Sequence, residues 1–324
     1  MHPFLPDHRN VVFFGYARTA LEYGFRYLGL QAGDEILYPA YICDVTMVPC
    51  NNLGIRVKFY EISDDLTVDF SNIRKTLTQK TRALLAVNYF GFPQPAAEIR
   101  NFCREHGLYF IEDSAHSFLS IINGLAAGSH GDISILSFRK MIPMVNGAAL
   151  VVNHQPADEE RIAFIQKCAA SLPPEISTMK RLKSLLHRLE DKYSIPFTKL
   201  RKAQSGFLPP GHAERENLPY RIDSQSLSIL EGINYEKVVR RRRRKYARWI
   251  ESLVPKGFTP IHGYLEDGIV PWACPLYTNH RDEWLTLFMK ARVRVTTWPT
   301  LPEWVGLHCK NAVALWQKLV VFPL

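Results

Sequence analysis

The feature that most constrains the fold is the alternation of short apolar runs with longer amphipathic segments over the first half of the chain. Residues 83–87 are all apolar, which is typical of strands buried on both faces of a parallel sheet. The segment that follows, residues 96–107, has apolar residues at helical spacing and ends in Gly107. Strands that alternate with helices of about 10–15 residues indicate βαβ units. The pattern therefore predicts an α/β fold with a mixed, mostly parallel sheet.

Other segments of the first half extend this pattern. We expect a first helix over residues 18–30, and strands over residues 35–38, 57–60, 83–87, 108–111, 133–138 and 148–152. Residues 155–215 are rich in Lys, Arg, Ser and Pro and contain no clear strand, so helices and a surface connection are expected there.

The last third of the chain predicts a smaller α+β unit. A long helix is expected from Gln225 to about Leu253, and residues 271–277, 282–291 and 293–295 have the patterns of further short elements. We therefore expect a large domain over residues 1–205 and a small C-terminal domain over residues 206–324.

Composition limits the class of protein. The 324 residues are 47% hydrophobic and 22% charged, as in globular proteins. The net charge of +9 favours anionic ligands. Six scattered Cys without a C-x-x-C pair predict no metal site and a reduced, cytoplasmic protein. No secretory signal and no apolar stretch of about 20 residues is visible, so no transmembrane segment is expected.

The basic run at residues 240–245 raises the question of nucleic-acid binding. Six consecutive cations cover every face of a helix rather than one stripe, and no aromatic residues are interleaved with them. The interpretation we favour is a solvated helix, or a patch that faces an acidic substrate or a neighbouring subunit. The sequence also lacks a P-loop, a G-x-G-x-x-G motif after the first strand and an H-E-x-x-H motif.

Open α/β sheets bind ligands at the carboxyl ends of their strands. Two candidate residues follow such strand ends, and one candidate segment precedes a helix. Asp113 follows the strand at 108–111, Lys140 follows the strand at 133–138, and residues 15–18 precede the first helix. A lysine, a carboxylate and a helix N-terminus suit pyridoxal phosphate, which needs a Schiff-base lysine, an acid at the pyridine nitrogen and an anion cradle. The chemistry that these residues predict is therefore that of a pyridoxal-phosphate enzyme.

Ordered motifs extend this prediction to a family. IEDSAH at 111–116 and GDISILSFRK at 131–140 resemble the DegT-like (DegT/StrS) sugar aminotransferases, and GDEI at 33–36, VNYFG at 87–91 and YRI at 220–222 are similar to further blocks of that family. The resemblance covers residues 11 to about 250. It implies an aspartate-aminotransferase-like (fold type I) large domain with a seven-stranded sheet, and a small α+β domain that closes over the site.

The resemblance also implies roles for individual residues. Lys140 would bind the cofactor covalently and act as general base, and Asp113 would pair with the pyridinium nitrogen. The other cofactor-binding residues that it implies are His116 near the ring oxygen, Ser137, Ala17 and Arg18 at the phosphate, and Tyr41 as the ring-stacking aromatic.

Some positions depart from the family pattern. Arg18 replaces a small polar residue of the phosphate loop, and an arginine can still bind phosphate with two hydrogen bonds. Ser137 and Lys140 are three residues apart where the family has five, and the residue in the other register, Ile142, cannot form an imine. Cys43 stands at the usual position of the stacking aromatic, which leaves Tyr41 as the substitute.

The resemblance implies transfer of an amino group from an amino acid, with glutamate as the donor, to a nucleotide-linked keto sugar in polysaccharide or secondary-metabolite biosynthesis. It also implies a homodimer, with Arg221 donated across the interface. Two alternatives stay open. One is a pyridoxal-phosphate enzyme of another reaction type, such as a dehydratase, although such relatives replace the lysine with His. The other is a non-catalytic binding or regulatory protein that retains the fold.

Overall fold

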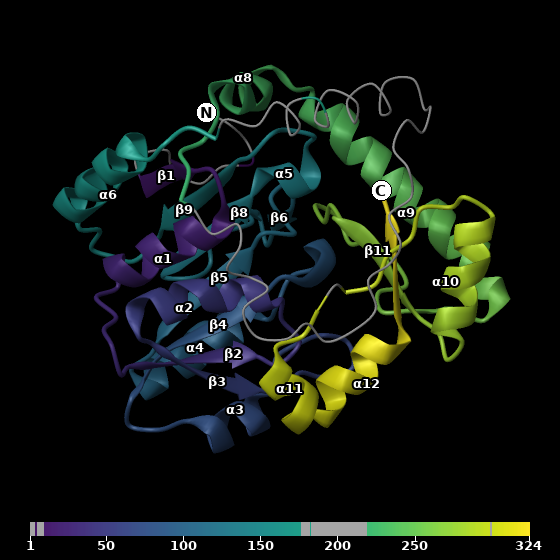
Figure 1. Ribbon diagram of the computed structural model, residues 1–324, viewed down its shortest axis with the longest axis horizontal. Helices are drawn as coiled ribbons and strands as arrows, with labels where there is room; N and C mark the ends of the chain where they lie inside the picture. The colour runs from purple at the N-terminus through teal and green to yellow at the C-terminus, as the bar shows by residue number, and fades with distance from the viewer. Residues whose placement is uncertain (1–3, 5–9, 176–181, 183–218, 299) are drawn as a thin grey trace.

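A mixed seven-stranded sheet forms the centre of the protein. The computed structural model describes residues 4, 10–175, 182, 219–298 and 300–324, and Figure 1 shows their arrangement. The strands of this sheet are β1 (Val11–Phe14), β2 (Glu35–Pro39), β3 (Arg56–Tyr60), β4 (Thr81–Val87), β5 (Tyr109–Ser114), β8 (Ile133–Ser137) and β9 (Ala148–Val152). Their spatial order is β1-β9-β8-β5-β4-β2-β3.

The direction of the strands confirms the predicted mixed, mostly parallel sheet. Strand β9 runs antiparallel to both of its neighbours, β1 and β8, whereas β8, β5, β4, β2 and β3 pair in parallel. Every residue of β2, β8 and β9 is buried, as expected for strands covered on both faces. The parallel arrangement brings the carboxyl ends of β5 and β8 to the same edge of the sheet.

Helices pack against this sheet and close the large core. Helix α1 contacts β8 and β9, α4 contacts β5, and α6 contacts β1. The helices of this half are α1 (Ala17–Tyr27), α2 (Val48–Leu53), α3 (Phe70–Thr76), α4 (Ala96–His106), α5 (Phe138–Met141) and α6 (Glu159–Ser171), with 3-10 turns at Asp44–Met47 and Tyr89–Gly91 and a two-stranded ribbon of β6 (Ile121–Ile122) and β7 (Leu125–Ala126).

Most of the C-terminal elements lie together beside the sheet, at the green-to-yellow end of the chain in Figure 1. They comprise the antiparallel strands β10 (Thr259–Pro260), β11 (Ala273–Tyr277) and β12 (Leu319–Pro323), and the helices α9 (Tyr235–Leu253), α10 (Arg281–Lys290), α11 (Glu303–His308) and α12 (Lys310–Lys318). Helix α8 (Ser224–Gly232) lies apart from them, next to β1. The expected boundary at 205/206 falls outside the described residues.

One expected element differs from the structure. The helix predicted over Gln225 to Leu253 is two helices, because the chain breaks at Ile233 and Asn234. The Asn234 side chain accepts a hydrogen bond from the Lys237 N–H at 2.8 Å and so caps a new helix start.

No described helix combines the length and the hydropathy that crossing a bilayer requires. No group of three or more His, Cys, Asp and Glu side chains in the described part of the chain is arranged as metal ligands.

Candidate active site

The structure brings Asp113 and Lys140 to one cavity of about 350 Å³. Asp113 lies near the end of β5 and pairs with Ile135 of the parallel neighbour β8. Lys140 lies in α5, the single turn of helix that starts immediately after β8. The two side chains line the same cavity because adjacent parallel strands end at the same edge of the sheet.

The charges of this pair are strongly affected by burial. Burial raises the pKa of the Asp113 carboxyl above its usual range, and the Lys140 ammonium opposes this shift. Burial lowers the pKa of Lys140 to about 8, although Asp113 and Cys43 act to raise it. A lysine with this pKa is partly neutral near physiological pH, as a nucleophile or general base must be.

A buried carboxylate next to Asp113 fixes the end of β5. Glu112 accepts hydrogen bonds from the side chains of Asn88 and Ser134 at 2.9 and 3.0 Å, and from the backbone N–H of His130 at 2.8 Å. The backbone N–H of Asn88 in turn donates to the carbonyl of Asp113 at 3.0 Å. Buried polar networks of this kind hold a side chain in one orientation.

His116 is buried beside the pair, on the wall of the same cavity. Its Nδ1 accepts a hydrogen bond from the backbone N–H of Phe90 at 3.2 Å, so the ring proton belongs on Nε2. Burial, together with the Lys140 charge, holds the pKa of His116 well below its usual value. The ring is therefore neutral and can donate one hydrogen bond from Nε2.

Two tryptophans from the C-terminal part complete the wall, and the sequence interpretation did not assign them to the site. The Trp272 ring stacks on His116 with centroids 4.2 Å apart, and the Lys140 Nζ lies 5.3 Å from its centroid. Trp298 meets His116 edge-on at 5.7 Å. The approach of Trp272 requires Gly91, because a Cβ there would lie 2.7 Å from the Val270 carbonyl oxygen.

Positive groups gather at another part of the cavity wall, near the start of α1. The N-cap residue Tyr16 makes no side-chain capping bond, and the N-terminus of a helix favours an anion. Arg18 and Arg139 both lie against the Tyr16 ring, with Cζ to centroid distances of 4.5 and 5.4 Å. Ala17, Arg18, Ser137 and Arg139 all line the cavity. Arg139 is a site candidate that the sequence interpretation missed, although it directly precedes Lys140.

Tyr41 is the expected site residue that the structure does not bring to the cavity wall. Its ring is fully buried and packs against Trp298 and Tyr89, with centroids 5.1 and 5.8 Å apart. The described residues that line the cavity include Cys43 instead. Tyr41 therefore supports the wall from behind, because the chain turns its side chain into the core.

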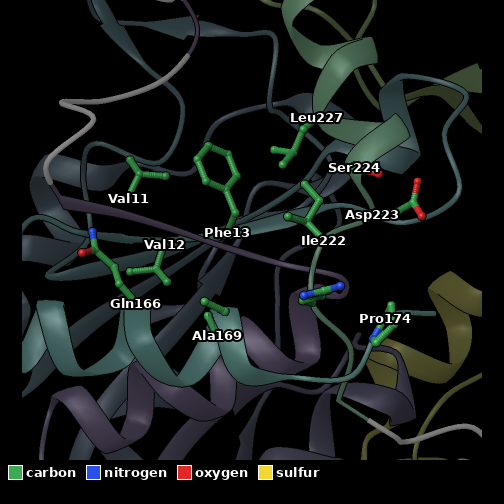
Figure 2. Close-up of a pocket in the computed structure, with 12 residues that line it drawn as sticks. Val11, Val12, Phe13, Gln166, Ala169, Pro174, Ile222, Asp223, Ser224 and Leu227 are labelled. Carbon is green, nitrogen blue, oxygen red and sulfur yellow. The ribbon is translucent and has the colours of Figure 1, made fainter.

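Arg221 also lies elsewhere. Figure 2 shows a second hollow, of about 640 Å³, along the edge strand β1 and next to α6 and α8. Arg221 and Asp223 line this hollow, whereas Lys140 and Asp113 do not. The preceding residue, Tyr220, anchors the segment to the start of α1, because its carbonyl accepts a hydrogen bond from the Gly15 N–H at 2.8 Å.

The donor set of the 350 Å³ cavity fits pyridoxal phosphate. It contains a lysine of lowered pKa, a buried carboxylate that suits a cationic ring nitrogen, and a helix N-terminus with two arginines that suits a phosphate. These groups would hold the cofactor through Lys140, Asp113 and the α1 end of the cavity.

Comparison with known proteins gives consistent relatives. The chain is 35% identical over 141 residues to a GDP-perosamine synthase of Vibrio cholerae, which covers 42% of this chain and 38% of that protein. It is 29% identical over 141 residues to a GDP-4-keto-6-deoxy-D-mannose 3-dehydratase of Yersinia pseudotuberculosis. That match covers 43% of this chain and 35% of the dehydratase. The chain thus spans less than two fifths of the length of these curated relatives.

The solved structures show the same fold over nearly the whole chain. A putative sugar aminotransferase of Streptococcus pneumoniae, solved in its PMP form, superposes with a TM-score of 0.73 at 17% identity, and covers 100% of this chain and 84% of that one. The model of the DegT/DnrJ/EryC1/StrS aminotransferase family matches residues 4–191, more than half of the sequence. The chain therefore belongs to the DegT/DnrJ/EryC1/StrS aminotransferase family.

Proposed function

We propose that this chain is an aminotransferase that uses pyridoxal phosphate to move an amino group from glutamate to a nucleotide-linked keto sugar. The observation that carries the proposal is the pairing of Lys140, with its pKa of about 8, and the buried Asp113 on one cavity wall. The GDP-perosamine synthase among the relatives supports a sugar substrate. The family resemblance implies a His at the lysine position of dehydratases, so Lys140 supports amino transfer.

Lys140 has two tasks in this reaction. The cofactor supplies an electron sink that makes the proton next to the amino group acidic. Lys140 would hold the cofactor, and its neutral Nζ would take up and return this proton. A pKa of about 8 leaves roughly a quarter of such amines neutral at pH 7.5, against about 0.1% for an ordinary lysine.

The other wall residues bind and orient. The Asp113 carboxylate would pair with the ring nitrogen of the cofactor and keep that nitrogen protonated. The neutral His116 offers its Nε2–H as a hydrogen-bond donor to the ring oxygen. Arg18, Ser137 and the α1 N-terminus would hold the phosphate of the cofactor.

The proposal includes a homodimer that acts in the cytoplasm. Arg221 lines the 640 Å³ hollow and not the cavity of its own Lys140, so a cofactor-site role for Arg221 requires a second subunit. All six cysteines are free thiols, which supports a reducing compartment.

A donor–acceptor screen tests the proposed reaction. The purified chain, loaded with pyridoxal phosphate, is incubated with glutamate and a panel of GDP-, dTDP- and UDP-linked keto sugars, and the products are identified by mass spectrometry. The proposal predicts an amino sugar and an equal amount of 2-oxoglutarate, both absent with Lys140→Ala. Loss of a sugar hydroxyl without amination would indicate the dehydratase alternative, and absence of cofactor binding would indicate a non-catalytic protein.

A further inference from the structure

The basic run at residues 240–245 lies in α9, and its side chains differ in how exposed they are. In α9, Arg242 is only 6% exposed and shares a buried face with Val238 and Tyr246, four residues before and after it. Arg240 and Arg244 are exposed. One cation of the run thus points into the protein, which the expectation of a solvated helix or a surface patch did not include.

Arg242 donates to backbone carbonyls from two separate parts of the chain. Its Nη2 donates to the carbonyl of Met141 at 2.7 Å, and its Nη1 donates to that of Trp272 at 3.0 Å. A weaker contact of 3.5 Å joins Nη1 to the Pro271 carbonyl. Hydrogen bonds from a charged group are stronger than those between neutral groups, so this guanidinium links the two segments.

Each of these segments carries part of the candidate active site. Met141 ends α5, the four-residue helix that bears Lys140, and the last carbonyls of a helix have no donors within the helix. Trp272 bears the ring that stacks on His116 and lies 5.3 Å from the Lys140 Nζ. The Arg242 guanidinium therefore holds the α5 turn, which bears Lys140, at a fixed distance from the Trp272 segment.

We infer that Arg242 is a positioning residue that clamps the Lys140 turn to Trp272 and so fixes the lysine amine in its buried place on the cavity wall. The inference rests on the proposed function only where it concerns cofactor binding. The placement of the amine itself is a property of the protein without cofactor.

The neighbouring arginine provides a matched control. Arg243 belongs to the same run and the same helix, and it also donates to carbonyls, those of Glu266 and Ile269, at 2.8 and 2.6 Å. These carbonyls belong to the loop before Pro271, and none of them belongs to α5. Replacing Arg243 thus removes a comparable number of hydrogen bonds and the same charge from α9 without releasing the Lys140 turn.

The test compares Arg242→Gln, Arg242→Lys and Arg243→Gln. Lys140 modification by an amine-reactive reagent is followed as a function of pH in cofactor-free protein, with the site resolved by peptide mass spectrometry. Asp113, Cys43, Arg139 and His116, the charged or titratable groups that face the amine, are kept in every variant. Binding of pyridoxal phosphate is measured in parallel by absorbance.

We expect Arg242→Gln to raise the Lys140 midpoint by about one pH unit, since a released turn admits water to the amine, and to weaken cofactor binding about tenfold. Arg243→Gln should leave the Lys140 midpoint and cofactor binding unchanged. Arg242→Lys keeps the charge but not the forked guanidinium, so its midpoint and binding should lie between those of the wild type and Arg242→Gln. If Arg242→Gln does not fold, Arg242→Lys carries the test.

The inference is overturned if a folded Arg242 variant keeps the wild-type midpoint, or if Arg243→Gln shifts it equally. A shifted midpoint in a protein that transfers no amino group would leave the clamp in place and refute only the proposed function.

Discussion

The amine of Lys140 lies 5.3 Å from the centre of the Trp272 ring, although the two residues belong to the sheet domain and to the C-terminal elements respectively. This contact closes the cavity around the lysine and contributes to the burial that lowers its pKa to about 8. The chemistry of the site therefore depends on how the C-terminal elements pack on the sheet edge.

The first prediction concerns the protonation of Lys140. In cofactor-free protein, modification of Lys140 by an amine reagent should be half-maximal near pH 8, where an ordinary lysine titrates near 10.5. Because the Asp113 carboxylate opposes the shift, Asp113→Asn should move the midpoint further down. A midpoint above 10 in the wild-type protein would contradict the buried placement of the amine.

The second prediction concerns stability. The pKa of Lys140 is lower in the folded than in the unfolded chain, so the unfolded chain binds more protons between pH 8 and pH 10.5 and this residue makes stability rise with pH across that window. In an Asp113→Asn background, where no buried carboxylate loses its cation, Lys140→Met should stabilise cofactor-free protein at pH 7 by about 3 kcal/mol. Denaturant unfolding at pH 7 and pH 10 measures this gain, which should shrink at the higher pH.

The third prediction concerns Asp113. Asp113→Asn retains the shape of the side chain but removes the charge that keeps the ring nitrogen protonated, so amino transfer should fall by about 100-fold or more. Steady-state kinetics should show the loss in kcat. Unchanged kcat with a raised KM for the sugar would instead place Asp113 in substrate binding.

The fourth prediction concerns the phosphate end of the cavity. Arg18→Ala should weaken pyridoxal phosphate binding about 10- to 100-fold, since a charge-assisted hydrogen bond is lost. Binding of pyridoxal, which lacks the phosphate, should change little, and this makes pyridoxal the internal control. An equal loss for both compounds would show that Arg18 does not contact the phosphate.

The fifth prediction concerns Gly91, which packs against the backbone of the segment that carries Trp272. Gly91 has a φ of +104°, and a Cβ there would lie 2.7 Å from the Val270 carbonyl oxygen. Gly91→Ala should destabilise the protein by about 2–4 kcal/mol. Gly107→Ala is the control, because Gly107 also has a positive φ but an added Cβ would meet nothing within 4 Å. It should cost about 1 kcal/mol, and similar losses for the two variants in thermal unfolding would refute the steric argument.

The sequence predicted the parts of the site that depend on strand order. Asp113 and Lys140 each follow a buried strand, and the carboxyl ends of parallel strands share one edge, so their meeting could be predicted from local pattern alone. The local pattern also predicted six of the seven strands, and the seventh, β1, was implied only by the family resemblance. The break at Asn234 was missed because the apolar spacing continues across it, although Asn is a common helix cap.

Contacts between distant segments could not be predicted in this way. Trp272 and Trp298 reach the cavity only through the packing of the C-terminal elements, and no local signal separates them from other core tryptophans. Tyr41 was chosen for its chemistry, but the direction in which its side chain points is set by the tertiary fold. The buried place of Arg242 follows from helix period and could be found only once the inner face of α9 was known.

The most direct test of the central claim is to locate the covalent attachment of the cofactor. The purified protein is incubated with pyridoxal phosphate, reduced with borohydride and digested, and the modified peptide is sequenced by mass spectrometry. The account predicts a pyridoxyl group on Lys140 at about one per chain, and none in Lys140→Arg. Stable modification of a different lysine, with Lys140 unmodified, would contradict it.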